Sequence, residues 1–318
     1  MTLAELIAAY KTDPDSGFRK LRYQVRLHHE RLCRRIEQDH GGVQIAELRA
    51  RQMLRWHEEW TGSGVAMAHG LMTMLRTLLS FGVVFLEDDE CARVSGILHN
   101  MRFPMAPRRD KRITAGQVVV FRQAAHAMGL HSLALAQAFQ FEAMFRQRDV
   151  IGEWVPHAEP GVSEIHSRGE KWLRGLRWSE IDDSLILRHV TSKRGKLIEI
   201  DLHLLPMVME ELGRFGGASP SGGPVIVSEA DDLPYAAHEF RRLWRKAARA
   251  AGIPDDVYNM DSRAGAISEA SDAGAELELI RHAATHSNIT TTQGYSRGGA
   301  EKVAEVARRR VAHRSRVA

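Results

Sequence analysis

Apolar residues recur at helical spacing through the first hundred residues of the chain. Between residues 18 and 38 they return every three or four positions, and arginines fill much of the remaining surface. The same period continues over 45–60, after a pair of glycines. Residues 65–85 are rich in Leu and Met and poor in charge, which is the pattern of a helix buried in a bundle. With a short capped helix over 2–10, this part predicts an all-helical domain.

A break in the helical period divides the chain. Residues 100–112 carry two prolines and five lysines or arginines, and the apolar period stops there. We expect a helical domain over 1–103, a basic linker over 104–112 and a second domain over 113–318. Such a linker suits contact with nucleic-acid phosphates, and it suits equally a flexible polar connector.

The second part of the chain mixes helices with one short hairpin. Two runs, 185–190 and 197–202, alternate apolar and polar residues on either side of a basic turn, which predicts an antiparallel β-hairpin. The segment 155–175, with its prolines and glycines, predicts an irregular loop. Helical patterns cover 114–127, 132–152, 236–251, 262–273, 277–282 and 299–318. The predicted fold class is therefore mostly α with a small antiparallel β-sheet (α+β).

Composition and charge place few limits on the partner. The chain is 44% hydrophobic, and 44 Lys and Arg against 40 Asp and Glu give a net charge of +4, which permits a nucleic-acid partner without requiring one. Basic helices such as 18–38 and 236–251 can lie along DNA or present a solvated face. Cys33 and Cys91 lack the spacing of a disulfide framework or a zinc site. No apolar run approaches the length of about 18 residues that a membrane span needs, so we expect a cytoplasmic protein with no membrane partner.

Candidate chemistry gathers in residues 255–297. Arg263 stands near a predicted helix start, His286 follows 23 residues later, and Tyr295 comes nine residues after that. Arginine can bind a phosphate oxygen bidentately, histidine can donate a hydrogen bond or a proton, and a tyrosine hydroxyl can attack phosphorus. The residue types alone suit equally three packed or solvated residues on helix surfaces.

The sequence around these residues resembles a known signature. The run THSNITTTQGYSR is similar to the carboxy-terminal motif of the tyrosine recombinases (phage integrase family), in which Leu-Gly-His-Ser precedes Thr-Thr-x-x-Tyr. Residues 285–287 occupy the first part of that motif and 291–295 the second. The segment that ends in Arg263 resembles the His-x-x-Arg box of the family, with one departure. Met260 stands where the family has histidine.

Two further boxes resemble the family more loosely. Arg146 and Asp149 stand as in the first arginine box, where an acid follows the arginine by three residues. An arginine among apolar residues needs a partner, so Arg146 either pairs with Asp149 or faces a bound phosphate. The turn of the predicted hairpin, 192–196, resembles Thr-Lys-x-Gly-Lys and puts Lys193 at the position of the family's lysine. Basic hairpin tips also occur for solubility alone.

The resemblance implies a fold and a reaction. The fold is a helical core-binding domain followed by a catalytic domain, and the activity is that of a site-specific recombinase or integrase acting on double-stranded DNA, as mobile elements use. Tyr295 would form a 3′-phosphotyrosyl link to the DNA. Arg146 and Arg263 would stabilise the phosphorane, and His286 would hydrogen-bond the phosphate. Lys193 would protonate the leaving 5′-oxygen, and no metal or other cofactor is implied.

The resemblance also implies an assembly and leaves two alternatives open. It implies a homotetramer on DNA, accessory DNA-bending or directionality proteins, and a nucleoid-associated location. The tail over 299–318 would be an assembly helix that docks on a neighbouring protomer, unless it packs on its own domain. Because Met260 departs from the family pattern, a catalytically decayed DNA-binding protein of the same fold stays possible. A type IB topoisomerase-like enzyme that relaxes DNA is the second alternative.

Overall fold

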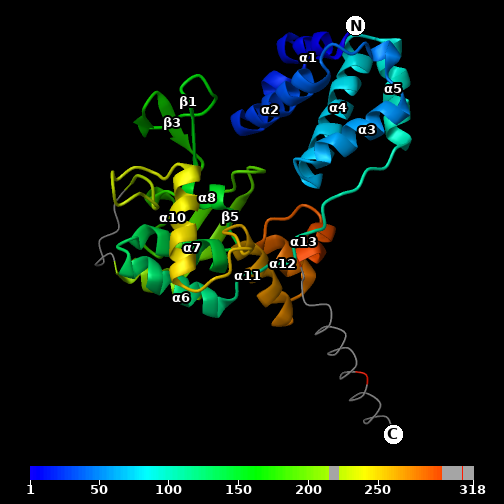
Figure 1. Ribbon diagram of the computed structural model, residues 1–318. Coiled ribbons are helices and arrows are strands. Elements are labelled where there is room, and N and C mark those ends of the chain that lie inside the picture. The colour runs from blue at the N-terminus through cyan, green and yellow to red at the C-terminus, as the bar shows by residue number, and fades with distance from the viewer. Residues whose placement is uncertain (215–221, 296–309, 311–318) are drawn as a thin grey trace. The chain divides into compact units, whose positions relative to one another are not determined.

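The computed structural model describes residues 1–214, 222–295 and 310, except for the side chains of 293–295. The chain divides into two compact units, Met1–Arg109 and Asp110–Ala318, which Figure 1 shows in blue to cyan and in green to red. Each unit has its own hydrophobic core. The division between them falls inside the segment predicted as a linker.

The first unit is a bundle of helices around α4 (Val65–Phe85). Nine residues of α4 are buried, and the prediction of a buried central helix is confirmed. The other helices of this unit are α1 (Leu3–Thr12), α2 (Tyr23–His40), α3 (Ala50–Thr61) and α5 (Asp89–Asn100). α2 and α3 begin later than the sequence pattern predicted, because 3-10 turns at Gly17–Lys20 and Ile45–Glu47 precede them.

One expectation about α4 needs correction. The helix has 21 residues and is mostly apolar, so by length and composition it could cross a membrane. Half of its apolar stretch is buried inside the first unit. A side chain added at Gly82 would place its Cβ 2.4 Å from the sulfur of Cys91, so α4 and α5 touch there without any gap. These contacts make α4 the core helix of its unit.

The second unit is built around α7 (His131–Glu142), in which ten of twelve residues are buried. α6, α9 and α11 pack against it. The helices of this unit are α6 (Ala115–Ala127), α8 (Gln147–Ile151), α9 (Pro206–Gly213), α10 (Ala237–Ala250), α11 (Asp261–Asp272), α12 (Leu277–Ala283) and α13 (Ile289–Tyr295). Buried amides fix α11 on α7, since Gln137 hydrogen-bonds the Ser262 hydroxyl at 3.0 Å and Gln140 exchanges two hydrogen bonds with Asn259. Because α11 carries Arg263, this network sets the position of a candidate site residue.

Two small antiparallel sheets complete the second unit. The predicted hairpin is confirmed, with β4 (Ile186–Val190) paired to β5 (Leu197–Asp201). The predicted irregular loop is wrong, because the same stretch forms a three-stranded sheet in the order β1-β3-β2. Its strands are Glu153–Pro156, Glu170–Leu173 and His166–Ser167. They have two to four residues each, too short for a clear alternation, and Trp154 stands opposite Trp172 in the β1–β3 pair. The fold class, mostly helical with small antiparallel sheets, is confirmed.

The predicted helix over 132–152 is interrupted. α7 ends at Glu142, Met144 has a left-handed backbone with φ of 52°, and α8 begins only at Gln147. The interruption has a tertiary cause, because the Arg263 guanidinium binds the carbonyl oxygen of Met144. Arg146 therefore precedes a short helix as its N-terminal flanking residue, and it does not lie inside a helix as predicted.

Candidate active site

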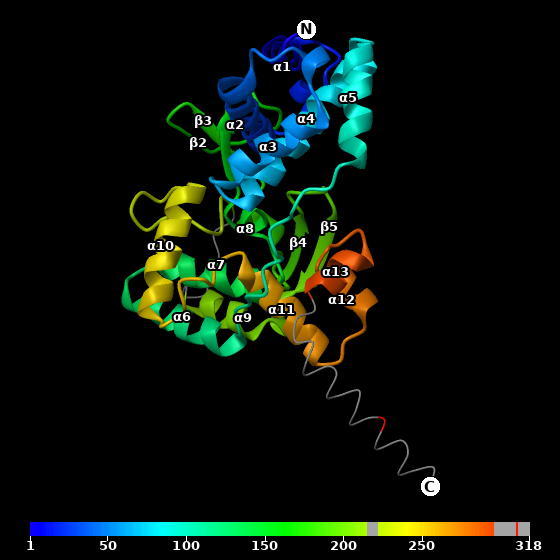
Figure 2. The same ribbon diagram turned by 45° about the vertical axis from the view of Figure 1, so that its right-hand side comes forward.

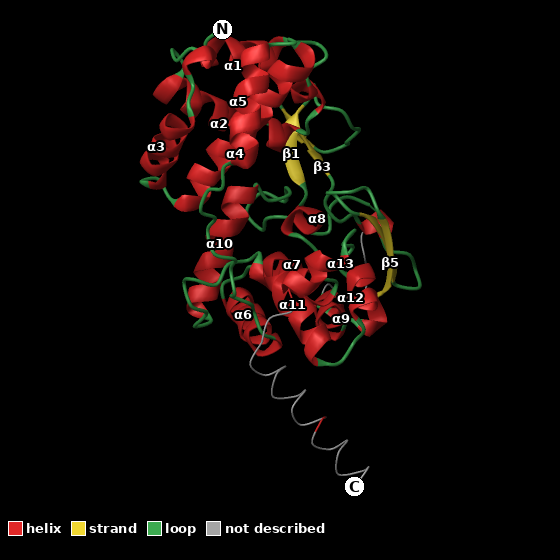
Figure 3. Cartoon of the chain, turned by 90° about the vertical axis from the view of Figure 1, so that its right-hand side faces the viewer, coloured by secondary structure: helices red, strands yellow, loops and turns green. Residues whose placement is uncertain are grey.

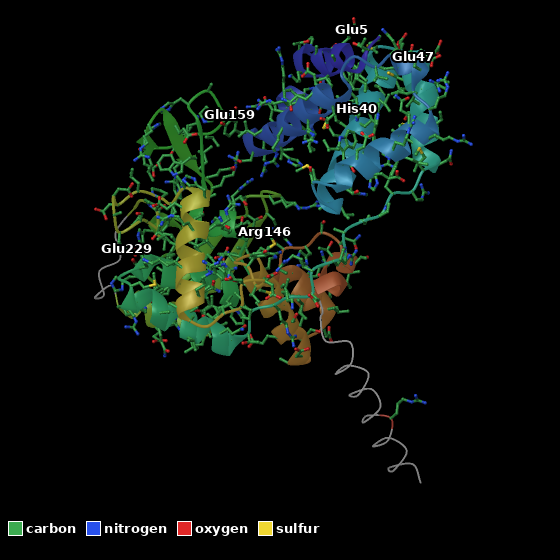
Figure 4. All side chains as sticks on the ribbon, viewed as in Figure 1. Glu5, His40, Glu47, Arg146, Glu159 and Glu229 are labelled. Atoms are coloured by element: carbon green, nitrogen blue, oxygen red, sulfur yellow. The ribbon has the colours of Figure 1, made fainter. Side chains whose placement is uncertain are left out.

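Hydrogen bonds bring three parts of the second unit together, namely the segment that leads into α8, the β4–β5 hairpin, and the α11 to α13 region. Figure 2 labels these elements, and Figure 3 shows them from another side. They are distant in sequence, and each carries one or more of the predicted site residues. Figure 4 labels Arg146 among the side chains of this unit.

Arg263 joins two of these segments. Its side chain is buried at 6% exposure, and one terminal nitrogen donates to the carbonyl of Met144 while the other donates to the carbonyl of Ala284. Met144 precedes Arg146 by two residues, and Ala284 precedes His286 by two. Arg263 therefore fixes the backbone beside both of these side chains, in addition to bringing its own charge.

Asp149 joins the arginine segment to the hairpin. This fully buried carboxylate accepts a hydrogen bond from the Arg146 backbone N–H at 3.2 Å and from the Ser192 backbone N–H at 2.6 Å. Its Oδ2 lies 3.7 Å from Nη1 of Arg146. Of the two interpretations of Arg146, the ion pair with Asp149 is present. The Arg146 side chain is 26% exposed, so an anion can still reach it.

Lys193 lies at the exposed tip of the hairpin. The turn is closed by Thr191, whose hydroxyl accepts from the Lys196 backbone N–H at 3.1 Å and whose own N–H donates to the Lys196 carbonyl at 2.9 Å. Gly195 takes a φ of 62°, a left-handed conformation that glycine adopts without steric cost. Ser192 is held by Asp149, so the base of the turn is fixed while the lysine side chain stays in solvent.

His286 is buried just after the end of α12. Its backbone N–H donates to the carbonyl of Arg281 at 2.9 Å, and the guanidinium of Arg281 donates back to the His286 carbonyl at 2.9 Å. Its Nδ1 lies 3.0 Å from the hydroxyl of Thr292 in α13, which is fully buried. α12 therefore fixes the backbone of His286, and α13 orients its imidazole.

The electrostatics of His286 show which residues share its surroundings. Burial, together with the positive charges of three nearby side chains, lowers the pKa of His286 to about 4, and burial is the largest cause. In order of effect these are Arg263, Arg146 and Lys193. The three predicted cations thus act on one imidazole, and that imidazole is neutral at pH 7.

The fold matches solved structures of DNA-bound integrases. A lambda integrase dimer bound to a COC′ core site gives a TM-score of 0.69 at 16% identity, over 93% of this chain and 77% of the other. A Tn1549 transposon integrase in complex with transposon right end DNA gives 0.68 at 13% identity, over 98% and 100%. A lambda integrase tetramer bound to a Holliday junction gives 0.67 at 16% identity, over 91% and 79%. The chain has the tyrosine recombinase fold. No protein-family model and no curated protein sequence matches it.

The expected nucleophile of this recombinase fold is only partly described. Tyr295 is the last residue of α13, three positions after Thr292, and its side chain lies outside the described part of the chain. The predicted assembly helix over 299–318 lies outside the described residues as well, apart from Arg310. Both expectations stay predictions.

Met260, at the position where tyrosine recombinases have histidine, directly precedes α11 and is 66% exposed. The thioether has no proton-transfer chemistry, so this position supplies no general base. An exposed position three residues before Arg263 leaves room for a larger polar side chain. A histidine introduced there would meet solvent on one side.

The expected basic face of α10 is more neutral than the sequence indicated. Arg249 binds the carboxylate of Asp255 at 2.9 Å, and Arg245 lies 3.5 Å from the same carboxylate. Arg242 lies 3.6 Å from Glu239. Three of the five basic residues on this helix therefore have acidic partners, which weakens their attraction to a DNA backbone.

Sequence reasoning missed Arg281, and it placed Thr292 inside the family motif without a role in orienting the site. Arg281 and Thr292 hold His286 from α12 and α13, and nothing in their spacing pointed to that role. Neither is identifiable without the packing of the two helices. Within the described ranges, no group of three or more His, Cys, Asp or Glu side chains is arranged to hold a metal ion.

Proposed function

We propose that this protein is a site-specific DNA recombinase that cleaves and rejoins double-stranded DNA through a 3′-phosphotyrosyl intermediate. The observation that carries the proposal is the set of contacts that gathers three positive side chains around one imidazole. Arg263 binds the backbone beside Arg146 and beside His286. Asp149 joins the Arg146 segment to the hairpin turn that carries Lys193. Fixed positive charge of this kind stabilises the additional negative charge of a phosphorane. The DNA-bound integrases that share the fold support a function in DNA recombination.

The proposed reaction moves the phosphoryl group from one oxygen to another. The Tyr295 oxygen attacks the scissile phosphorus, a P–O bond to tyrosine forms, and the bond to the 5′-oxygen breaks. Lys193 gives a proton to that 5′-oxygen, and the tyrosine proton leaves to water, since Met260 accepts none. The free 5′-hydroxyl of a partner strand then reverses the step. The ester keeps the energy of the broken bond, so the reaction uses no ATP.

Arg146 and Arg263 bind the non-bridging oxygens in this proposal, and His286 donates a hydrogen bond to one of them. A neutral imidazole can donate from Nε2 when its Nδ1 accepts the proton of the Thr292 hydroxyl. The 3.0 Å separation of these two atoms suits that arrangement. The arginines supply the charge that a metal ion supplies in other phosphoryl-transfer sites, so no metal or other cofactor takes part.

The proposed partners follow from strand exchange. Recombination needs several active sites around two duplexes, so we propose a homotetramer on DNA, and the lambda integrase tetramer on a Holliday junction shows that this fold can assemble so. Accessory DNA-bending or directionality proteins, a cytoplasmic location and association with nucleoid DNA belong to the same proposal, as does service to a mobile element.

A plasmid assay separates this function from the topoisomerase alternative. The protein is incubated with a supercoiled plasmid that carries two candidate sites in direct repeat and with a matched plasmid that carries none. A recombinase resolves the first plasmid into two circles and leaves the second supercoiled. Relaxation of both plasmids without circles would support a type IB topoisomerase-like enzyme instead.

Met260 tests the decayed alternative, in which the protein binds DNA without cleaving it. Met260→His restores an imidazole at the family position, and a positioned base typically contributes about 100-fold or more to a rate. We expect a measurable rate of DNA cleavage by the wild-type protein and a faster rate in this variant. Met260→Gln, which has a similar volume and no basic nitrogen, is the control. A wild-type protein that binds its site with no cleavage, and gains cleavage only as Met260→His, would indicate decay.

A further inference from the structure

Thr285 has a backbone conformation that its side chain disfavours. Its φ is 52°, in the left-handed region, where a β-branched residue is a genuine outlier. The tyrosine recombinase motif quoted above has glycine at this position, and glycine adopts such a φ without steric cost. The residue is buried at 5% exposure, so contact with solvent does not account for its hydroxyl.

The left-handed conformation itself comes from the end of α12. The Thr285 backbone N–H donates to the carbonyl of His282 at 2.9 Å, and the next N–H, of His286, donates to the carbonyl of Arg281 at 2.9 Å. Helices commonly end in this way, usually with glycine or asparagine at the left-handed position. Local stability alone would therefore favour glycine here, and the threonine needs another explanation.

The hydroxyl of Thr285 contacts a residue of the site. Its Oγ1 accepts a hydrogen bond from Nη1 of Arg146 at 3.4 Å, across 139 residues of sequence. The same nitrogen lies 3.7 Å from Oδ2 of Asp149. The guanidinium is thus held between a carboxylate that belongs to its own segment and a hydroxyl that belongs to the His286 segment. With glycine at position 285, the guanidinium would keep its contact with Asp149 and lose the contact with the hydroxyl.

We propose that Thr285 is a positioning residue for Arg146, whose hydroxyl fixes the guanidinium toward the bound phosphate at the expense of a disfavoured backbone. The inference rests on the proposed function, since it concerns the phosphate that a recombinase would cleave. Thr285 does not touch the reacting atoms in this account. It acts through Arg146. The threonine side chain therefore lowers the stability of the fold through its backbone conformation and raises the cleavage rate through its hydroxyl.

Three variants at this position test the proposal by separating the effect on stability from the effect on the cleavage rate. Thr285→Gly removes the backbone conflict and the hydroxyl together, Thr285→Val removes only the hydroxyl, and Thr285→Ser keeps the hydroxyl. We measure the Tm of each variant and its single-turnover rate of covalent-complex formation on a nicked duplex. A purely structural residue would change Tm and rate in the same direction, or change Tm alone.

The expected changes in Tm and in cleavage rate have opposite signs for Thr285→Gly. Thr285→Gly should keep or raise the Tm and cleave about 10-fold more slowly or worse, because small misplacements of a phosphate-binding group are costly to rate. Thr285→Val should cleave as slowly, and Thr285→Ser should cleave within about 2-fold of wild type, since it restores the donor–acceptor pair. A Thr285→Gly protein that cleaves at the wild-type rate would overturn the proposal.

A second measurement keeps the inference separate from the proposed function. Inorganic phosphate is titrated into each protein, and the imidazole signals of His286 are followed by NMR, with no DNA present. Weaker phosphate binding by the Gly and Val variants than by wild type and Thr285→Ser supports the positioning role, even if wild-type protein forms no covalent complex with DNA. Equal phosphate affinity in all four proteins would overturn the positioning role, whatever the cleavage assay shows.

Discussion

Asp149 accepts a hydrogen bond of 2.6 Å from the backbone N–H of Ser192, and this contact joins two segments that are 43 residues apart. On one side the carboxylate caps the turn that carries Arg146, and on the other it fixes the residue before Lys193. One buried side chain therefore sets the distance between a phosphate-binding arginine and the proposed general acid. The site depends on this contact as much as on the groups that face the substrate.

Asp149→Asn should separate the two segments without removing a group that touches DNA. An amide presents an NH₂ group to one of the two backbone donors, and the loss of a buried hydrogen bond of this kind costs about 1–3 kcal/mol. We expect a lower Tm and a cleavage rate reduced about 100-fold, with DNA affinity little changed. Quenched time courses of covalent-complex formation on a nicked duplex measure the rate, and gel retardation measures the affinity. Equal losses of affinity and rate would contradict a positioning role for Asp149.

Lys193→Ala should slow cleavage by about 100-fold or more, because a general acid typically contributes that much. Lys196→Ala is the matched control, since Lys196 lies at the exposed tip of the same turn. A duplex with sulfur in place of the scissile 5′-oxygen sharpens the test, because a thiolate leaves without protonation. The sulfur substrate should restore cleavage by Lys193→Ala. An equal defect on both substrates would show that Lys193 acts by charge and not as the acid.

Protonation of His286 should destabilise the fold. An unfolded histidine has a pKa near 6.5, and the folded-state pKa of His286 is about 4. The unfolded chain therefore binds the proton first as the pH falls. The stability that the neutral imidazole contributes is complete above pH 6.5 and is lost progressively between 6.5 and 4.

Urea unfolding at several pH values measures this loss. His286→Asn should show a shallower decline of the unfolding free energy over the same window than wild type, while the exposed His238→Asn should decline as wild type does. A His286→Asn protein with an unaltered slope would contradict the lowered pKa.

Gly265 makes a close contact between the chain entering the second unit and α11. An added Cβ there would lie 1.9 Å from the carbonyl oxygen of Ile113, whose own N–H approaches the Asp261 carbonyl at 3.4 Å. Gly265→Ala should therefore destabilise the protein by about 1–3 kcal/mol, the usual effect of overpacking. Thermal unfolding measures it, with Gly116→Ala as control, because a Cβ at Gly116 meets nothing within 4 Å. An unchanged Tm in Gly265→Ala would show that the contact relaxes freely.

The parts of the fold that local pattern determines could be predicted from sequence. The apolar period of 65–85 and the alternation around the turn at 192–196 were sufficient for α4 and for the β4–β5 hairpin. The break between α7 and α8 could not be predicted, because its carbonyl at Met144 is bound by Arg263 from a distant helix. The three-stranded sheet could not be predicted either, because its strands are too short to show an alternation of apolar and polar residues.

The candidate site divides in the same way. The order and spacing of Arg263, His286 and Tyr295 could be recognised through their resemblance to a family motif, and the structure places the first two beside each other. The hydroxyl contacts that hold the site could not be recognised. Thr292 contacts the His286 imidazole from α13, and Thr285 contacts the Arg146 guanidinium from the loop after α12. A sequence does not show which of its hydroxyls such packing will bury.

The most direct test of the account asks whether Tyr295 becomes attached to DNA. Nicked duplexes with candidate recombination sites, which trap the cleaved strand, are incubated with wild-type protein and with Tyr295→Phe, and the products are separated on a denaturing gel. Tyr258→Phe, at a half-exposed tyrosine of the same unit, is the matched control. The account predicts a covalent band for wild type and for Tyr258→Phe, and none for Tyr295→Phe. A covalent band that persists in Tyr295→Phe, or bound sites with no covalent band for wild type, would contradict it.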